Sequence, residues 1–176
     1  MNKIYFKRLV INATENSNDP INFPKTLEIL PDRSIDFKNH CGAFVVKPTN
    51  GGSSVGVEII KEGNQVPIIN SATSYNLMAE EYVGSKELTV TVLQEQPLCV
   101  TEIKAGQDKD FYNYEAKYEK NGSIHDIPAK IPKNTYNQAM SWALRVHQII
   151  GCKGISRSDF RYDDENDKLY MLEINT

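Results

Sequence analysis

Residues 47–56 have the composition of a loop that binds phosphate. Lys47 ends an apolar run that predicts a strand over residues 44–46, and glycine, serine and threonine follow it. Such a run leaves backbone N–H groups able to bind phosphate oxygens, and Lys47 adds a positive charge beside them. The spacing fits neither the P-loop nor the dinucleotide-binding fingerprint. A flexible hairpin turn leading to a second strand, residues 57–60, has the same composition, so both interpretations stay open.

A second set of polar residues, near the C-terminus, could bind a divalent cation. Glu173 and Asn175 stand two apart in a predicted strand, so their side chains share a face. A hairpin would place Asp159 opposite Glu173, and two carboxylates with an amide oxygen suit Mg²⁺, which keeps other positions for water and phosphate. Arg157, on the face of Asp159, could stabilise a developing oxyanion or phosphate. A solvated polar hairpin face remains the alternative.

A long segment, residues 106–122, carries aromatic and charged side chains without a helical or strand period. Loops of this length are usually functional or disordered, and the aromatic residues argue against disorder. The segment includes Lys117. A phosphate loop, several lysines, an oxygen-rich metal site and this loop together predict phosphoryl transfer, in which metal ions and cations spread the charge of the γ-phosphate.

The elements that must position these residues follow from hydrophobic periodicity and from the residues that interrupt it. The predicted strands cover residues 25–30, 44–46, 57–60, 76–83, 87–93, 97–104, 155–162 and 168–175. The predicted helices cover residues 3–13 and 134–150. Asn134 or Thr135 would cap the second helix, and Gly151 would end it.

Length, charge and composition narrow the class of protein. The 176 residues suit one domain or two small ones, and the net charge of −3 argues against a nucleic-acid partner. No apolar run reaches the length of a membrane span, and the N-terminus has no signal-peptide core. Three widely spaced cysteines predict a reduced, cytoplasmic setting with buried or inert thiols, and the histidines lack zinc spacing.

Four separated motifs occur along the chain in a fixed order. They are Val46-Lys47-Pro48 with Gly52-Ser53-Ser54-Val55-Gly56; Glu80-Glu81-Tyr82-Val83 with Glu87-Leu88-Thr89-Val90; Tyr112-x-Tyr114-Glu115-Ala116-Lys117-Tyr118; and Gly151-Cys152-Lys153-Gly154-x-x-Arg157-x-Asp159-Phe160, closed by Leu172-Glu173-Ile174-Asn175-Thr176. Together they resemble the D-alanine–D-alanine ligase family of the ATP-grasp superfamily. The resemblance covers nearly the whole chain, and the aromatic third motif is its most specific part.

The resemblance implies an α+β ATP-grasp fold with two subdomains, each with a mainly antiparallel sheet and packed helices. We expect subdomain 1 in residues 1–86, with the phosphate loop and an adenine hinge, and subdomain 2 in residues 87–176, with the aromatic loop and the metal hairpin. In the implied reaction ATP phosphorylates the carboxylate of one D-alanine, and the amine of a second D-alanine attacks the acyl phosphate. The product serves peptidoglycan precursor synthesis. The implied parent protein is a cytoplasmic homodimer with no nucleic-acid or membrane partner.

The resemblance also implies a set of residues that bind ATP. They are Lys3, Lys47, Ser53, Ser54, Glu80, Glu81, Tyr82, Val83, Glu87 and Lys117. Lys3 and Lys47 would contact the phosphates, Glu80 to Val83 would meet adenine, and Glu87 would hold the ribose hydroxyls. Ser53 and Ser54 lie on the loop that would cover the phosphates.

The same resemblance implies the catalytic and metal-binding residues. Lys117 would reach the γ-phosphate, and Tyr118 would hydrogen-bond Ser53 and help to close the loop. Arg157 would stabilise the tetrahedral intermediate. Two Mg²⁺ ions, with Mn²⁺ as the alternative, would be bound by Asp159, Glu173 and Asn175.

The chain departs from the family pattern at both ends. The family's preceding domain, with a glutamate for the first D-alanine, and its later Pro-Gly segment, with a serine for the second, have no counterpart here. We therefore expect a truncated chain that binds nucleotide without ligase turnover. A non-catalytic ATP- and Mg²⁺-binding fragment and another ATP-grasp carboxylate–amine ligase remain the alternatives. The motif ending in Tyr118 argues against an enzyme that makes a D-alanyl–D-lactate ester.

Overall fold

The elements of the computed structural model follow the predicted periodicity over most of the chain. The structure describes residues 2–32, 34–35, 42–51, 55–61, 76–105 and 123–176. The helices and strands are α1 (Lys3–Thr14), β1 (Thr26–Leu27), β2 (Phe44–Pro48), β3 (Glu58–Ile60), β4 (Leu77–Glu81), β5 (Lys86–Leu93), β6 (Gln96–Ala105), β7 (Ser123–Asp126), α3 (Lys133–Ile150), β8 (Ile155–Asp163) and β9 (Lys168–Asn175). Within these residues, neither helix has the length and apolar content needed to span a membrane.

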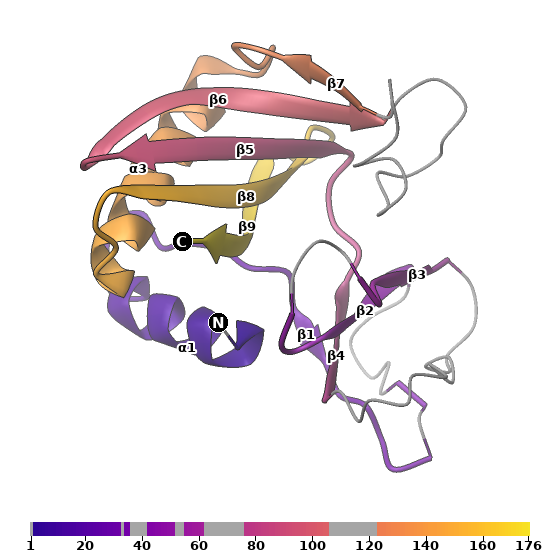
Figure 1. Ribbon diagram of the computed structural model, residues 1–176. Helices are drawn as coiled ribbons and strands as arrows, with labels where there is room; N and C mark the ends of the chain where they lie inside the picture. Colours follow the sequence, from indigo (N-terminus) through magenta and orange to yellow (C-terminus); the bar gives the residue numbers. More distant parts are fainter. Residues whose placement is uncertain (1, 33, 36–41, 52–54, 62–75, 106–122) are drawn as a thin grey trace. The chain divides into compact units, whose positions relative to one another are not determined.

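The chain forms two compact units, and each contains an antiparallel sheet. Unit 1 comprises Met1–Phe6 and Pro24–Tyr82, and its described strands are ordered β1-β4-β2-β3. Unit 2 comprises Lys7–Phe23 and Val83–Thr176, and its described strands are ordered β7-β6-β5-β8-β9 (Figure 1). Two antiparallel sheets with helices confirm the predicted α+β class. The subdomain boundary expected at residue 86 concerns the family's functional division and stays a prediction.

The core of unit 1 is built by the alternation of β2. Phe44 and Val46 are fully buried, whereas Val45 and Lys47 on the other face are only half-buried. β2 pairs with both β3 and β4, which confirms the predicted hairpin after the strand at residues 44–46. The inward side chains pack with Leu27, Ile35 and Ala79. Lys47 is therefore held at a fixed place on the sheet, opposite Met78 of β4.

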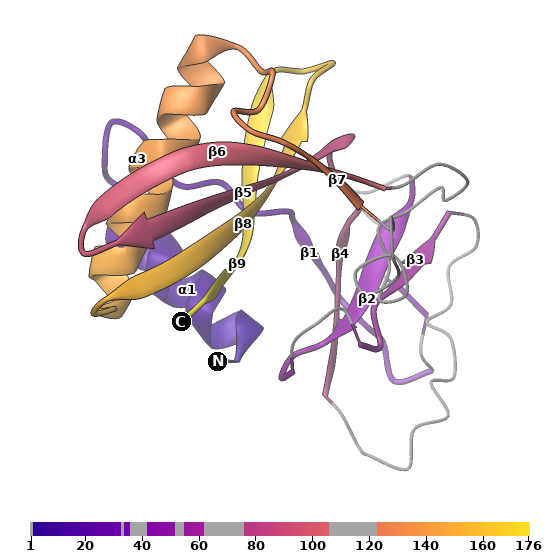
Figure 2. The ribbon, with the colours of Figure 1, turned by 45° about the horizontal axis from the view of Figure 1, so that its top comes forward.

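The core of unit 2 lies where α3 packs on one face of the five-stranded sheet (Figure 2). The sheet contributes fully buried Leu88, Val90 and Val92 from alternate positions of β5. The helix contributes a buried stripe that includes Trp142 and Val146. The intervening residues of β5 point to the opposite face of the sheet, because side chains alternate along a strand.

The ends of α3 agree only in part with the sequence expectation. Gly151 adopts the left-handed conformation, with φ of 71°, and ends the helix as predicted. The helix begins earlier than predicted, after Pro132, and has no side-chain cap. The predicted capping role of Asn134 or Thr135 is therefore wrong. The Thr135 hydroxyl is buried and donates instead to Asp167 Oδ1 at 3.1 Å.

Three other expectations have different outcomes. The strand predicted over residues 25–30 is reduced to the short β1, with an isolated bridge from Ile29 to Ile35 beyond it. The loop predicted over residues 106–122 lies outside the described residues. Cys99 and Cys152 are free thiols and only half-buried, and burial raises the pKa of the Cys152 thiol.

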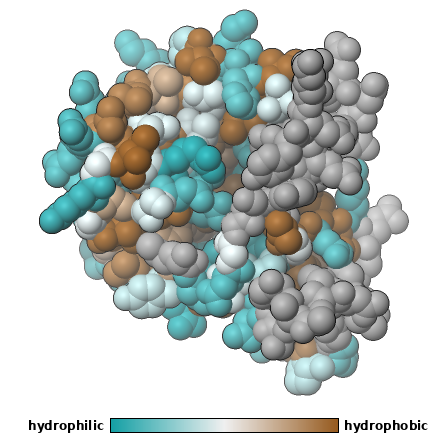
Figure 3. Space-filling view, in the orientation of Figure 1, coloured by the Kyte–Doolittle hydropathy of each residue, from teal (hydrophilic) through white to brown (hydrophobic). Residues whose placement is uncertain are grey.

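Some large hydrophobic side chains remain exposed. Leu93 and Ile155 are partners in the β5–β8 ladder and are 44% and 61% exposed. On the face of the molecule in Figure 3, hydrophobic residues lie among hydrophilic ones. Scattered exposed apolar residues are ordinary on globular proteins, so exposure alone assigns these side chains no role.

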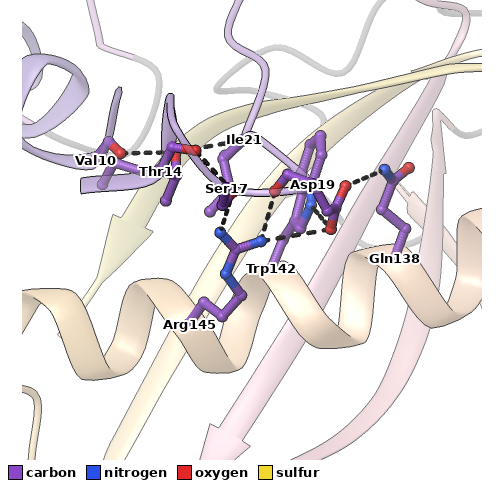
Figure 4. A network of polar contacts seen from close by, with 8 residues as sticks. All are labelled: Val10, Thr14, Ser17, Asp19, Ile21, Gln138, Trp142 and Arg145. Carbon is purple, nitrogen blue, oxygen red and sulfur yellow. Dashed lines mark hydrogen bonds and ion pairs between the residues drawn. The ribbon is translucent and has the colours of Figure 1, made fainter. Parts of the chain in front are cut away.

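Asp19 anchors the segment that follows α1 onto α3 (Figure 4). Its carboxylate accepts hydrogen bonds from Trp142 Nε1 at 2.7 Å and from Gln138 Nε2 at 2.8 Å. Its backbone carbonyl accepts a bond from Arg145 at 2.6 Å. Because Trp142 is fully buried, its indole N–H depends on an acceptor inside the protein.

We expect Asp19→Ala to lower the free energy of unfolding by about 1–3 kcal/mol, because it leaves a buried indole N–H without an acceptor. Asp19→Asn keeps an acceptor oxygen and should lose less. Urea unfolding followed by the fluorescence of the single tryptophan would measure both. Equal stability of Asp19→Ala and the wild type would show that the Asp19 contacts contribute nothing.

Candidate functional site

In unit 1, Lys47 and Glu80 form an ion pair that the fold largely buries. Lys47 Nζ lies 2.5 Å from Glu80 Oε2, and the two side chains are 11% and 5% exposed. β2 and β4 bring them together, because Val45 pairs with Glu80 in the antiparallel ladder. Two residues expected to bind nucleotide are thus each other's partners in the absence of a ligand.

The backbone at the start of the phosphate loop is bonded to the start of α1. Lys3 N donates to Thr49 O at 2.8 Å, and Lys3 Nζ donates to Gly51 O at 2.9 Å. The Asn2 side chain caps α1 by accepting from the backbone N–H groups of Ile4 and Tyr5. Lys3, expected from a short motif alone, therefore has a defined place beside the loop.

Glu81 and Tyr82 follow Glu80 at the end of β4. Glu81 is half-buried, and Tyr82 is 36% exposed. Their backbone N–H groups donate to Lys25 O and Ala43 O, each at 3.0 Å. Contact of these two residues with adenine would therefore use carbonyl oxygens or side chains.

In unit 2, Asp159 is surrounded by hydrogen-bond donors. Arg157 binds its carboxylate through Nε and Nη2, both at 2.9 Å. Thr89 Oγ1 donates to Oδ1 at 2.7 Å, and Asn175 Nδ2 donates to Oδ2 at 3.0 Å. The predicted hairpin and the shared face of Arg157 and Asp159 are confirmed.

Glu173 completes the predicted set of metal ligands. It pairs with Asp159 across the β8–β9 ladder, and Asn175 pairs with Arg157. Two carboxylates and an amide therefore lie on neighbouring strands, as expected. In the part of the chain that the structure describes, no group of three or more His, Cys, Asp or Glu side chains comes together. A metal here would thus rely on the amide oxygen and on ligands from outside the protein.

Sequence reasoning missed two residues that contact the candidate site. Thr89 lies opposite Asp159 in the β5–β8 ladder, and Arg161 continues the alternation of Arg157 and Asp159 along β8. Arg161 Nη1 lies 3.8 Å from Glu87 Oε2, and Glu87 is half-buried. The signal was the polar alternation along both strands, continued one step further.

Four predicted site residues cannot be placed. Ser53, Ser54, Lys117 and Tyr118 lie outside the described residues. Val83 is half-buried at the start of the second segment of unit 2. The structure therefore brings together two separate groups, one in each unit: Lys3, Lys47 and Glu80 in unit 1, and Glu87, Arg157, Asp159, Glu173 and Asn175 in unit 2.

Comparison with known proteins gives consistent matches. The family model described as "D-ala D-ala ligase C-terminus" matches residues 38–176. A D-alanine–D-alanine ligase of Acidiphilium cryptum is 48% identical over 136 residues, which is 76% of this chain and 44% of that protein. The chain thus spans less than half the length of this curated relative.

Solved structures share the fold. D-alanyl-alanine synthetase A of Vibrio cholerae has a TM-score of 0.71 at 22% identity, over 99% of this chain and 55% of that one. The D-alanine–D-alanine ligase of Bacillus anthracis complexed with ATP has a TM-score of 0.66 at 17% identity, over 99% and 54%. These likenesses confirm the predicted ATP-grasp fold.

We expect Lys47→Met to lower the free energy of unfolding by roughly 3–5 kcal/mol, because it removes this cation from a buried carboxylate. Adding Glu80→Gln should restore much of the loss, since a neutral amide is less costly to bury than a carboxylate. Thermal unfolding of the two variants would measure the difference. A stable single variant would mean that Glu80 does not depend on Lys47.

Proposed function

This chain belongs to the D-alanine–D-alanine ligase family, and from that premise we propose that it is the ATP-grasp part of an ATP-dependent ligase that makes D-alanyl-D-alanine for peptidoglycan precursors. The observation that carries the proposal is the 48% identity over 136 residues to a relative named D-alanine–D-alanine ligase. That relative is matched over 44% of its length, so the reaction is proposed for the whole protein. ATP as the nucleotide is supported by the ATP complex of the Bacillus anthracis ligase.

In this proposal the chain's residues hold ATP and compensate its charge. The γ-phosphate passes to the carboxylate of one D-alanine, the amine of a second attacks the resulting acyl phosphate, and inorganic phosphate leaves. Lys3 and Lys47 supply positive charge beside the phosphate loop, and Lys117 serves the γ-phosphate. Ser53 and Ser54 cover the phosphates. The Arg157 guanidinium stabilises the tetrahedral intermediate, as a fixed fork of donors can.

The remaining assignments concern the nucleoside and loop closure. Glu80 to Val83 meet adenine, and Glu87 accepts hydrogen bonds from the ribose hydroxyls. Tyr118 bonds Ser53 and helps to close the phosphate loop. For the whole protein we propose a homodimer in the cytoplasm, where ATP and reduced thiols occur together.

The donors on β8 and β9 fit Mg²⁺. Asp159, Glu173 and Asn175 offer oxygen atoms from neighbouring strands, which a hard cation prefers. When bound, Mg²⁺ would neutralise charge on the nucleotide phosphates. The Thr89 hydroxyl holds one carboxylate oxygen of Asp159 at 2.7 Å and so orients this ligand before any cation arrives.

Mg²⁺ should bind weakly to this site without nucleotide, because Arg157 competes for the same carboxylate. We expect Arg157→Ala to tighten nucleotide-free Mg²⁺ binding by about tenfold, since a charge-assisted contact is removed from Asp159. Calorimetry on the 176-residue chain would measure both dissociation constants. Lys168→Ala, which removes an exposed charge from the same hairpin, is the control and should change little. Weaker Mg²⁺ binding in Arg157→Ala would contradict the competition.

The proposed reaction is tested on the whole protein by following ADP and dipeptide together. With ATP and D-alanine we expect ADP and D-alanyl-D-alanine in equal amounts, and no dipeptide with L-alanine. ADP formation that does not require D-alanine would contradict the proposal. An ester product with D-lactate would favour the alternative ligase. Nucleotide binding without any turnover would favour the non-catalytic alternative.

A further inference from the structure

Arg161 links a strand of unit 2 to the backbone just before β5. Its guanidinium is largely buried, and the residue is 8% exposed. Nε donates to Val83 O at 3.2 Å, and Nη2 donates to Gly84 O at 2.6 Å. Nη1 faces Glu87 Oε2 at 3.8 Å. One side chain therefore contacts two consecutive carbonyls and one carboxylate.

The backbone that Arg161 contacts is fixed by further interactions within unit 2. Gly84 has φ of 66°, and a Cβ atom there would lie 2.8 Å from Tyr162 C and O. Ser85 N donates to Tyr162 O at 3.1 Å, and Ser85 Oγ donates to Asp164 Oδ1 at 2.5 Å. This second bond holds the pKa of Asp164 below its usual range. The segment Val83–Lys86 is thus seated on the end of β8 rather than being a loose connection.

We infer that Arg161 is a positioning residue for nucleoside recognition, acting through the Val83 carbonyl and the Glu87 carboxylate. The inference rests on the proposed function, which assigns Val83 to adenine and Glu87 to the ribose hydroxyls. It adds a residue that none of the four sequence motifs contributes to ligand binding. Arg161 touches neither ligand in this assignment and sets the places of two groups that do.

The chemistry of the side chain explains why an arginine suits this place. A guanidinium has five N–H donors in a rigid plane, so one group can bond adjacent carbonyls and still face a carboxylate. A lysine offers one point charge on a flexible stem and cannot hold all three acceptors. Loss of the fork would leave the carbonyls and Glu87 to reorient, and a carboxylate that reads two vicinal hydroxyls depends on its orientation.

The test compares ligands that differ only in what Glu87 reads. We expect wild-type 176-residue chain to bind ATP more tightly than 2′-deoxyATP in calorimetry. Arg161→Met should weaken ATP binding by about tenfold, the loss of one hydrogen bond to a charged group, and should abolish the preference over 2′-deoxyATP. Binding of inorganic triphosphate should not change, because the phosphate-binding residues are untouched.

Arg145→Met is the matched control. Arg145 also donates to a backbone carbonyl in unit 2 at 2.6 Å, but its partner is Asp19. This variant should lower the melting temperature and keep the ATP preference. A structural role for Arg161 would give the same pattern in Arg161→Met, and that result would overturn the inference.

Two further variants keep the inference falsifiable if Arg161→Met does not fold. Arg161→Lys retains a cation near Glu87 and should show an intermediate preference for ATP over 2′-deoxyATP. In Glu87→Gln, adding Arg161→Lys should cause no additional loss of preference, because both act through one group. Additive losses would overturn the inference. Wild-type chain that binds no ATP would instead contradict the proposed function, and this inference with it.

Discussion

The alternation of side chains along β8 is the constraint on which the candidate site depends. Every second residue, from Ser156 to Phe160, is buried on the side of the sheet covered by α3. The residues between them, Arg157 and Asp159, must then point to the other face. β8 also lies between β5 and β9, so Thr89 and Glu173 are brought to the same carboxylate from both sides. Packing against α3 thus fixes the polar face without any polar interaction being required to form it.

The charged residues of both units share one feature, which is that each is compensated within its own unit. Lys47 faces Glu80, Arg157 binds Asp159, and Arg161 lies near Glu87. Buried or half-buried charges need such partners, because desolvation of an isolated charge costs several kcal/mol, by rough estimate. A ligand that binds to these residues must therefore replace an existing interaction. Net affinity is then a difference between two sets of contacts, which makes it sensitive to the protein partner of each ligand residue.

Sequence periodicity was sufficient for the strands of both units, because one buried face imposes a period of two. It was also sufficient to place Asp159 opposite Glu173, since a short hairpin leaves few registers. It failed at the start of α3, where Pro132 begins the helix and Thr135 turns inward to Asp167. It could not reveal Arg161 as a contact of Val83, because that bond joins residues 78 positions apart and depends on a glycine backbone at Gly84. Local patterns specify elements, whereas these bonds arise only when elements pack.

The contacts of Asp159 connect the resting structure to the proposed chemistry. Arg157 occupies both oxygens of Asp159, and its side chain is otherwise half exposed, at 51%. In the proposed ligase, Asp159 binds the cation that accompanies ATP, so this pair must at least partly separate when the nucleotide is bound. The Arg157 guanidinium is then released at the place where the resemblance assigns it to a developing negative charge. A donor released in this way loses one anionic partner and is electrostatically suited to another, which favours its use at the transition state rather than in the resting protein. Thr89 and Asn175 remain to orient Asp159 throughout, because their bonds do not depend on the guanidinium.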